Sequence, residues 1–167
     1  MLSADNAVAL CQLLEQGAIR FWVMGGWGLD ALLRRQTRLH KDLDILVLLD
    51  DLTRLQSLLD EHGFVRKLIW KESRWVEMAS GRLPTAFVAA DIQGRELDVH
   101  IIEATTGGSI IQHFDPPWPF PTDIAAQGRI SRVAVSCVSR ETQIAMHTGY
   151  SLPESHLRDL ELLRADG

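Results

Sequence analysis

Apolar residues recur at helical spacing near both ends of the chain. Between Ser3 and Gly17 the spacing predicts a first helix, because serine commonly caps a helix N-terminus and glycine commonly follows its end. The same spacing predicts a helix over residues 52–62 and another over residues 140–147. A last helix is expected after Pro153, since a proline ring fits the first helical turn.

Short apolar runs predict strands in much of the remaining sequence. Residues 21–24 form one such run, which stops at a glycine pair before helix-like spacing resumes at Trp27. Residues 42–49 predict a buried strand, because their aliphatic run is short and includes β-branched residues. Four more strand candidates cover residues 64–70, 74–79, 86–92 and 96–102. Together the elements predict an α/β (α+β) fold, with an antiparallel or mixed sheet in the middle of the chain.

Prolines and aromatic residues alternate in residues 107–128. Four prolines exclude a helix or a central strand there, so we expect one long loop. Loops of that length in compact domains are commonly functional lids or disordered segments, and the apolar content argues against disorder.

The length and composition bound the kind of protein. The 167 residues fit a single domain over 1–167 with a short C-terminal helical tail, and 46% apolar with 23% charged residues is ordinary for a globular protein. Cys11 and Cys137 lie far apart and outside any zinc-ligand spacing, so we expect both to be reduced. Residues 1–17 lack the basic start of a secretory signal, which predicts a cytoplasmic protein with no membrane segment.

The charge balance says more about partners than about the fold. With 17 Lys and Arg against 22 Asp and Glu, the formal charge of −5 argues against a broad electrostatic grip on nucleic acid. It slightly favours a cationic ligand or a bound metal ion.

Three aspartates are the strongest candidates for chemistry. Asp42 and Asp44 alternate with apolar residues along a predicted strand, so both carboxylates project from one face. Asp98 stands in the same pattern on another predicted strand. Carboxylates held together repel one another, and a divalent cation that prefers oxygen ligands relieves the repulsion. A lone D-x-D is more often just the polar start of an edge strand, but the repeat of the pattern at Asp98 favours a metal site.

Gly25 and Gly26 precede a predicted helix. The absence of side chains lets a ligand approach the backbone, and the first helical N–H groups attract anions, so a phosphate could bind there. Strand–glycine–helix turns also occur for packing alone.

Other polar and aromatic residues leave two interpretations open. Arg38 could bind phosphate oxygens through its guanidinium or be solvated. His40 and His100 could each orient a carboxylate or phosphate, or be packed. Trp27 and Trp118 could stack on a base or an apolar ligand, with the core favoured for Trp27 and ligand contact for Trp118.

Five segments together resemble the small antibiotic nucleotidyltransferases, among them the lincosamide nucleotidyltransferases and the aminoglycoside 2″-nucleotidyltransferase group. These segments are residues 25–30 (GGWGLD), 37–44 (TRLHKDLD), 96–100 (ELDVH), 118–121 (WPFP) and 147–150 (HTGY). The resemblance therefore spans nearly the whole chain.

The resemblance implies the nucleotidyltransferase fold and roles for the candidate residues. Gly25 and Gly26 would open a helix under the nucleotide phosphates. Arg38 and Trp27 are candidate nucleotide contacts from their side-chain chemistry, not from the resemblance. Asp42, Asp44 and Asp98 would hold Mg²⁺, and Asp98 is either the general base or only a metal ligand. The resemblance therefore implies an antibiotic adenylyltransferase.

The implied reaction moves AMP from ATP to an antibiotic hydroxyl and releases pyrophosphate. The acceptor would be a lincosamide or an aminoglycoside. Longer relatives carry a further helical domain around the acceptor, so a homodimer could supply the missing wall here. The alternative is a regulatory or antitoxin-like partner on the same fold, which binds or modifies another protein.

Overall fold

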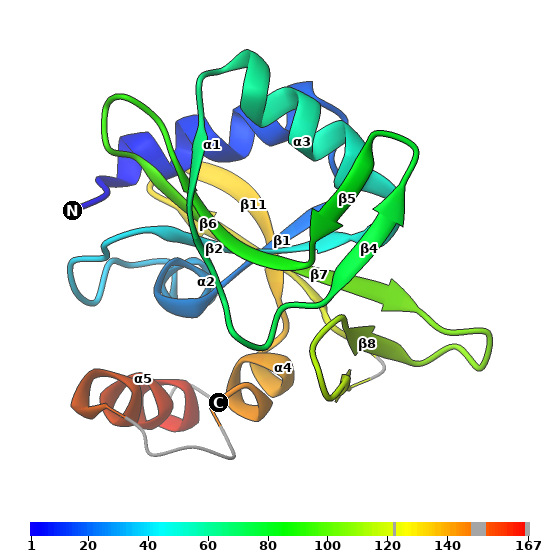
Figure 1. Cartoon of the computed structure of the whole chain (residues 1–167). Coiled ribbons are helices and arrows are strands. Elements are labelled where there is room, and N and C mark those ends of the chain that lie inside the picture. Colours follow the sequence, from blue (N-terminus) through cyan, green and yellow to red (C-terminus); the bar gives the residue numbers. More distant parts are fainter. Residues whose placement is uncertain (122, 148–152, 166–167) are drawn as a thin grey trace.

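The computed structural model describes residues 1–121, 123–147 and 153–165 (Figure 1). Nine strands of the described part form one sheet: β1 (Phe21–Met24), β2 (Leu43–Leu48), β3 (Val65–Ile69), β6 (Ala86–Ala90), β7 (Glu96–Ala104), β8 (Ile110–Gln112), β9 (Trp118–Phe120), β10 (Ala125–Ile130) and β11 (Val133–Val138). A separate ribbon pairs β4 (Trp75–Met78) with β5 (Gly81–Pro84). The helical elements are α1 (Ala4–Gln16), α2 (Gly25–Leu33), the 3₁₀ turn η1 (Leu49–Asp51), α3 (Leu52–Glu61), α4 (Arg140–Ala145) and α5 (Glu154–Ala165).

The sheet is mixed, as the sequence predicts. Its strands follow the order β10-β11-β1-β2-β7-β6-β3, and β8 and β9 extend it beside β7. The pairs β1–β11 and β2–β7 are parallel, whereas the others are antiparallel. In Figure 1, α1 and α3 cover one side of the sheet, and α4 and α5 lie on the other side.

The main hydrophobic core lies between the sheet and the helices α1, α2 and α3. The alternating pattern of β2 and β7 directs six side chains into it: Leu43, Ile45, Val47, Leu97, Val99 and Ile101. A smaller cluster on the opposite face contains Met24, Leu46, Ile102, Phe120, Ile124 and Val138. The strands thus separate an apolar face from a face that is free to carry polar groups.

The predicted helices form with the expected ends. The Ser3 hydroxyl accepts a hydrogen bond from the N–H of Asn6 at 3.2 Å, which caps α1, and Gly17 follows its last residue. Within α3, four leucines at helical spacing are buried: Leu52, Leu55, Leu58 and Leu59. None of the helices in the described residues is both long enough and apolar enough to cross a bilayer.

Residues 107–128 are not one long loop, which corrects the prediction. They contain β8, β9 and the start of β10. Proline excludes a central strand, but β9 pairs with β8 alone, so the missing N–H of Pro119 breaks no ladder on its open side. Strands β5 and β11 were not predicted either, although β11 is a central strand between β10 and β1.

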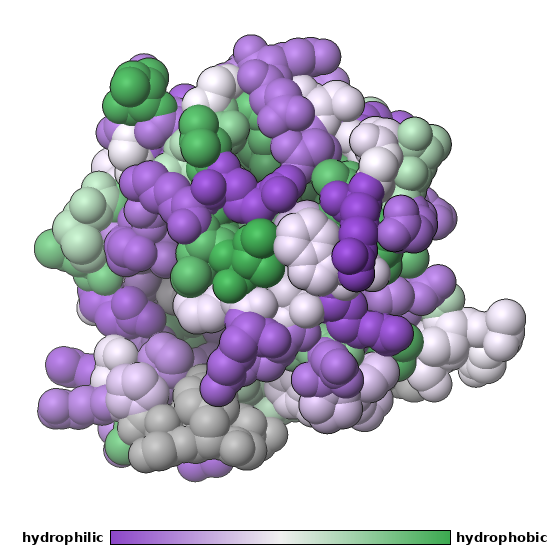
Figure 2. All heavy atoms as spheres, viewed as in Figure 1, coloured by the Kyte–Doolittle hydropathy of each residue, from purple (hydrophilic) through white to green (hydrophobic). Residues whose placement is uncertain are grey.

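The β3 edge of the sheet is exposed. Val65, Leu68 and Ile69 are 67%, 44% and 38% accessible. Figure 2 shows apolar side chains gathered in the middle of this face among hydrophilic ones. A register shift between Arg66 and Leu68 interrupts the pairing of β3 with β6. An irregularity of this kind, with basic residues beside it, discourages further strand addition.

Candidate functional site

The parallel register of β2 and β7 brings two of the predicted aspartates side by side. Asp44 pairs with Asp98, and both side chains lie on the face opposite the main core. Asp42 stands just before β2, two residues from Asp44, and so belongs to the same face. The three predicted carboxylates therefore lie near one another on the same face of the sheet.

These carboxylates destabilise one another in the absence of a cation. Burial, together with the nearby charges of Asp42 and Asp98, holds the pKa of Asp44 well above its ordinary value of 3.8. Burial and the charge of Asp98 also raise the pKa of Asp42. The site thus favours a bound cation or proton at this cluster.

The glycine pair lies directly beside this cluster. Helix α2 begins at Gly25 itself, so no separate turn precedes it. Gly25 has a φ of +61°, and a Cβ there would lie 2.2 Å from Oδ2 of Asp44. A Cβ on Gly26 would lie 2.2 Å from Nδ1 of His40. Both positions therefore need glycine, Gly25 for its backbone conformation and both for space.

A polar cavity of about 320 Å³ opens where the glycines meet the aspartates. Its lining combines acidic, basic and small residues from α2, from β2 and the segment before it, from the segment after α4, and from α5: Gly25, Gly26, Arg38, His40, Lys41, Asp42, Asp44, His147, Ser155, His156 and Asp159. Two permanent cations, two glycines and two of the predicted aspartates thus share one space. This composition suits a ligand that carries phosphates and a metal ion.

Arg38 reaches this cavity while paired with the C-terminal helix. Its Nη2 lies 2.9 Å from Oδ2 of Asp159, and its Nε donates to Oδ1 at 3.3 Å. The Asp159 side chain is 3% exposed, whereas that of Arg38 is 33% exposed. Hydrogen bonds to Asp159 raise the pKa of Arg38, so its charge is secure. Arg38, the residue predicted to bind phosphate, therefore also links α5 to the site.

Asp30 organises the loop that carries Arg38. Its Oδ1 accepts hydrogen bonds from the backbone N–H and the hydroxyl of Thr37, at 3.0 and 2.6 Å. Its Oδ2 lies 2.5 Å from Nε2 of His40, which is 3% exposed. His40 is thus packed and held by Asp30, and its ring also contacts Trp27 at a centroid distance of 4.7 Å.

The prediction that Trp27 contacts the nucleotide is wrong. The residue is 1% exposed and belongs to the main core, and it is absent from the lining of the polar cavity. A buried indole offers no face on which a base could stack. Trp118, in contrast, lines a cavity, as its interpretation as a ligand contact requires.

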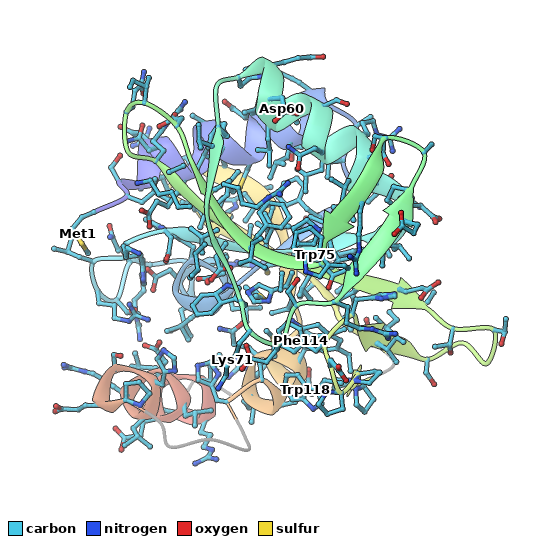
Figure 3. The ribbon with its side chains drawn as sticks, viewed as in Figure 1. Met1, Asp60, Lys71, Trp75, Phe114 and Trp118 are labelled. Atoms are coloured by element: carbon cyan, nitrogen blue, oxygen red, sulfur yellow. The ribbon has the colours of Figure 1, made fainter. Side chains whose placement is uncertain are left out.

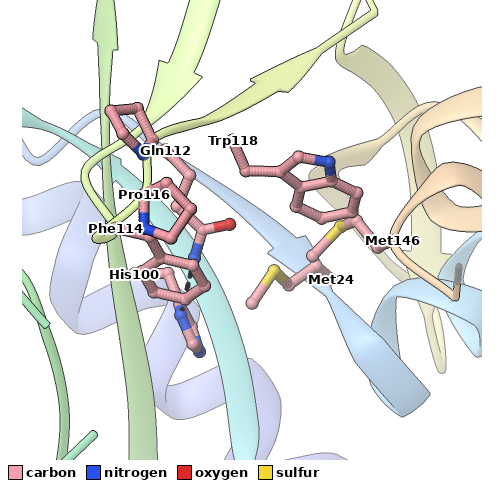
Figure 4. A pocket seen from close by; sticks show the side chains of 8 residues that line it. Met24, His100, Gln112, Phe114, Pro116, Trp118 and Met146 are labelled. Carbon is pink, nitrogen blue, oxygen red and sulfur yellow. Dashed lines mark hydrogen bonds between the residues drawn. The ribbon is translucent and has the colours of Figure 1, made fainter. Parts of the chain in front are cut away.

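That second cavity is apolar, has a volume of about 370 Å³ and lies on the same side of the sheet as the aspartates (Figure 4). Its lining is Met24, His100, Gln112, Phe114, Pro116, Pro117, Trp118 and Met146. Figure 4 shows His100, Phe114 and Pro116 on one wall and Trp118, Met24 and Met146 on the other. Figure 3 places Phe114 and Trp118 at the end of the molecule that carries α4.

Two residues connect the apolar cavity to the carboxylates. Met24 pairs with Asp44 across β1 and β2. His100 lies two residues beyond Asp98 on β7, with its Nε2 at 3.1 Å from Oδ1 of Asp98. A ligand in the apolar cavity would therefore lie against residues that contact or pair with the acidic cluster.

The acidic cluster fits Mg²⁺ as a shared ligand set and not as a closed cage. Within the described ranges, no three His, Cys, Asp or Glu side chains converge as a preformed metal site. Mg²⁺ usually binds one or two carboxylates and completes its octahedron with water and substrate phosphates. Adjacent carboxylates with a raised pKa, beside a glycine-lined cavity that also holds two cationic side chains, meet that requirement.

Several residues of the site carried no usable signal in the sequence. His156 and Asp159 come from α5, whose sequence predicts only an amphipathic helix. Trp70 follows β3, yet its indole Nε1 donates to Oδ1 of Asp98 at 2.8 Å. His147, from the last motif of the resemblance, lines the polar cavity, while residues 148–150 lie outside the described residues. Only three-dimensional proximity reveals these contacts.

The sequence of the chain is similar to those of known proteins. A model described as aminoglycoside-2″-adenylyltransferase matches residues 7–163 of the chain. A lincosamide resistance protein of Staphylococcus haemolyticus is 26% identical over 162 residues, which covers 93% of this chain and 91% of that protein.

Two solved structures share the fold. The lincosamide antibiotic adenylyltransferase LnuA, solved with lincomycin bound, superposes with a TM-score of 0.79 at 24% identity and covers 98% of both chains. ANT(2″)-Ia, solved with adenylyl-2″-tobramycin, gives a TM-score of 0.70 at 19% identity, over 97% of this chain and 89% of that one. The predicted fold, a mixed sheet flanked by helices, is confirmed.

Proposed function

Because the chain belongs to the aminoglycoside-2″-adenylyltransferase family and is an antibiotic nucleotidyltransferase, we propose that it adenylylates a hydroxyl of a lincosamide-type antibiotic. The donor is ATP with Mg²⁺, and pyrophosphate is the second product. The observation that carries this proposal is the contact between an apolar cavity and an acidic cluster through His100.

The polar cavity is the proposed site of the nucleotide phosphates. Gly25 and Gly26 leave the N-terminus of α2 open, where N–H groups and the helix dipole attract anions. Arg38 offers a planar donor fork for phosphate oxygens, and Lys41 adds a point charge. Mg²⁺ held by Asp42 and Asp44, beside Asp98, would neutralise charge on the transferring phosphoryl group.

The apolar cavity is the proposed acceptor site, and its chemistry favours one acceptor class. Among the residues that the structure describes, none that lines this cavity is acidic. A polycationic aminoglycoside would find no carboxylate to pair with there, whereas an apolar ring or alkyl group could pack against Phe114, Trp118 and the two methionines. The acidic balance of the whole chain, which slightly favours a cationic acceptor, is therefore outweighed by the composition of the cavity itself.

In the proposed reaction the acceptor hydroxyl oxygen attacks the α-phosphorus of ATP. One O–P bond forms as the bond from that phosphorus to the pyrophosphate oxygen breaks, and Asp98 accepts the hydroxyl proton. A general base of this kind contributes about 10²–10⁴-fold to a rate. Asp42 and Asp44 stay ionised as ligands of the cation.

The test is pyrophosphate release from ATP and Mg²⁺ with lincomycin or tobramycin as acceptor. We expect release with lincomycin only, lost in Asp42→Asn and in Asp98→Asn. Asp50→Asn serves as the control, because the side chain of Asp50 is 87% exposed. Release with tobramycin alone would overturn the acceptor class. Folded protein that releases pyrophosphate with neither acceptor would revive the regulatory or antitoxin-like alternative, which the comparisons do not favour.

A further inference from the structure

We propose that Trp70 and His100 are positioning residues that hold Asp98 by one oxygen and leave the other for the acceptor. The indole Nε1 of Trp70 donates to Oδ1 of Asp98 at 2.8 Å, and Nε2 of His100 lies 3.1 Å from the same oxygen. The hydrogen bond from Trp70, together with the His100 ring within ion-pair distance of the same oxygen, restrains the rotation of the carboxylate group. The role of this arrangement in nucleotidyl transfer rests on the proposed function. The contacts of Trp70 and His100 with Asp98 are independent of it.

Gln112 sets the donor role of His100. The Gln112 amide Nε2 lies 2.9 Å from Nδ1 of His100, and an amide nitrogen can only donate. Nδ1 therefore accepts, so the neutral ring carries its proton on Nε2, which faces Asp98. Gln112 is 2% exposed, and this burial keeps the amide in place.

The same chain of contacts forms part of the acceptor cavity. His100 and Gln112 both line it, and Gln112 pairs with Trp118 across β8 and β9. The edge of the Phe114 ring packs against His100, with the ring centroids 5.7 Å apart. An acceptor that fills this cavity therefore touches the residues that orient the proposed base.

Packing alone does not account for Trp70. Its residue surface is 37% exposed, yet its indole N–H is aimed at a carboxylate that is 6% exposed. Trp75 is a matched comparison, because it is 43% exposed on the adjoining ribbon and packs under the guanidinium of Arg82. A merely structural tryptophan near this surface should behave like Trp75.

The first test measures the hydrogen bond itself, by NMR of the indole N–H groups in ¹⁵N-labelled protein. The chain has 5 tryptophans, so Trp70→Phe and Trp75→Phe identify the two resonances of interest. We expect Asp98→Ala to move the Trp70 indole proton upfield and speed its exchange, and to leave Trp75 unchanged. An unmoved Trp70 resonance in folded Asp98→Ala protein would overturn the proposal, whatever the enzyme's substrate.

The second test separates positioning from binding by steady-state kinetics, with the acceptor that gives pyrophosphate release. We expect Trp70→Phe to lower kcat by about 10–100-fold, the scale of a misplaced reacting group, and to leave KM for ATP unchanged. Trp75→Phe should retain the wild-type kcat. An unchanged kcat in Trp70→Phe would overturn the role, although the reaction itself would stand.

A conservative pair at His100 completes the design. His100→Gln places an amide N–H near the former Nε2 and should keep more of kcat than His100→Asn, whose shorter amide lies near the former Nδ1. Equal losses in the two variants, accompanied by equal drops in Tm, would indicate a structural role and contradict the proposal.

Discussion

At the scale of single residues, Asp44 shows how a functional group weakens the fold that carries it. Burial and two neighbouring carboxylates raise its pKa, so the ionised form that a metal needs is unfavourable in the folded, metal-free protein. We expect Asp44→Asn to abolish nucleotidyl transfer and to raise Tm at pH 7 by about 2–4 °C, roughly 1 kcal/mol for a chain of this size.

The raised pKa of Asp44 determines how the Tm difference between the variant and the wild type changes with pH. With the folded pKa above the ordinary 3.8, wild-type stability from this group is fully present below that value and is lost as pH rises through the raised pKa. The Tm difference between Asp44→Asn and wild type should therefore vanish near pH 3.5 and open as pH rises, as differential scanning calorimetry can show. A Tm difference that stays constant with pH would contradict a raised pKa of Asp44.

Gly25 makes a second prediction possible at this scale. Gly25→Ala combines backbone strain at φ +61° with a Cβ 2.2 Å from Oδ2 of Asp44. Gly63→Ala meets a similar φ of +71° but no atom within 4 Å. We expect both variants to lose about 1 kcal/mol or more in urea unfolding. Only Gly25→Ala should also lose transfer activity, because it displaces a carboxylate.

The candidate site was predictable where a local pattern encodes it. Alternation along two strands predicts that Asp42, Asp44 and Asp98 share one face, and the parallel register of β2 and β7 delivers that arrangement. The neighbours that tune them were not predictable. Trp70 and Gln112 reach the site through pairings of distant strands, which no spacing in the sequence reveals.

At the scale of elements, an ion pair with a residue far back in the sequence helps to attach α5. Arg38 and Asp159 are 121 positions apart, and the carboxylate is almost fully buried. We expect Arg38→Ala to destabilise the protein by about 1–3 kcal/mol, since it leaves a buried acceptor without its cation. Hydrogen exchange should show the loss concentrated in α5.

The double variant Arg38→Ala/Asp159→Ala is the control for that prediction. Removing both partners leaves no orphaned charge, so the double variant should lose less stability than the sum of the two single ones. Additive losses would mean that the pair contributes nothing as a pair. KM for ATP should rise in both variants that lack Arg38, because its proposed phosphate contact is gone.

The elements that the sequence predicted well are those whose pattern is local. Helix α1 has a clear serine cap, α3 has clear leucine spacing, and both form as expected. The error over residues 107–128 has a physical reason: proline excludes central strands but not edges, and β9 is an edge. Strand β11 was not predicted, because its position beside β1 depends on a parallel pairing of distant segments.

At the scale of the whole molecule, the question is whether one chain makes a complete site. The resemblance to longer relatives suggested that a second copy supplies the wall of the acceptor site, and that homodimer stays a prediction. In the structure, residues of the same chain form walls of both cavities. Phe114, Trp118 and Met146 line the apolar cavity, and α5 borders the polar one.

We therefore expect specific activity to stay constant on dilution, whatever the mass of the protein in solution. If a partner supplied a required wall, specific activity would fall once the concentration dropped below the dimer dissociation constant, because the fraction of complete sites would fall with it. Sedimentation velocity over the same dilution range measures the mass independently. Activity that declines in step with dissociation would show that the cavity walls of one chain are insufficient, and the acceptor site would then have to be assigned across two copies.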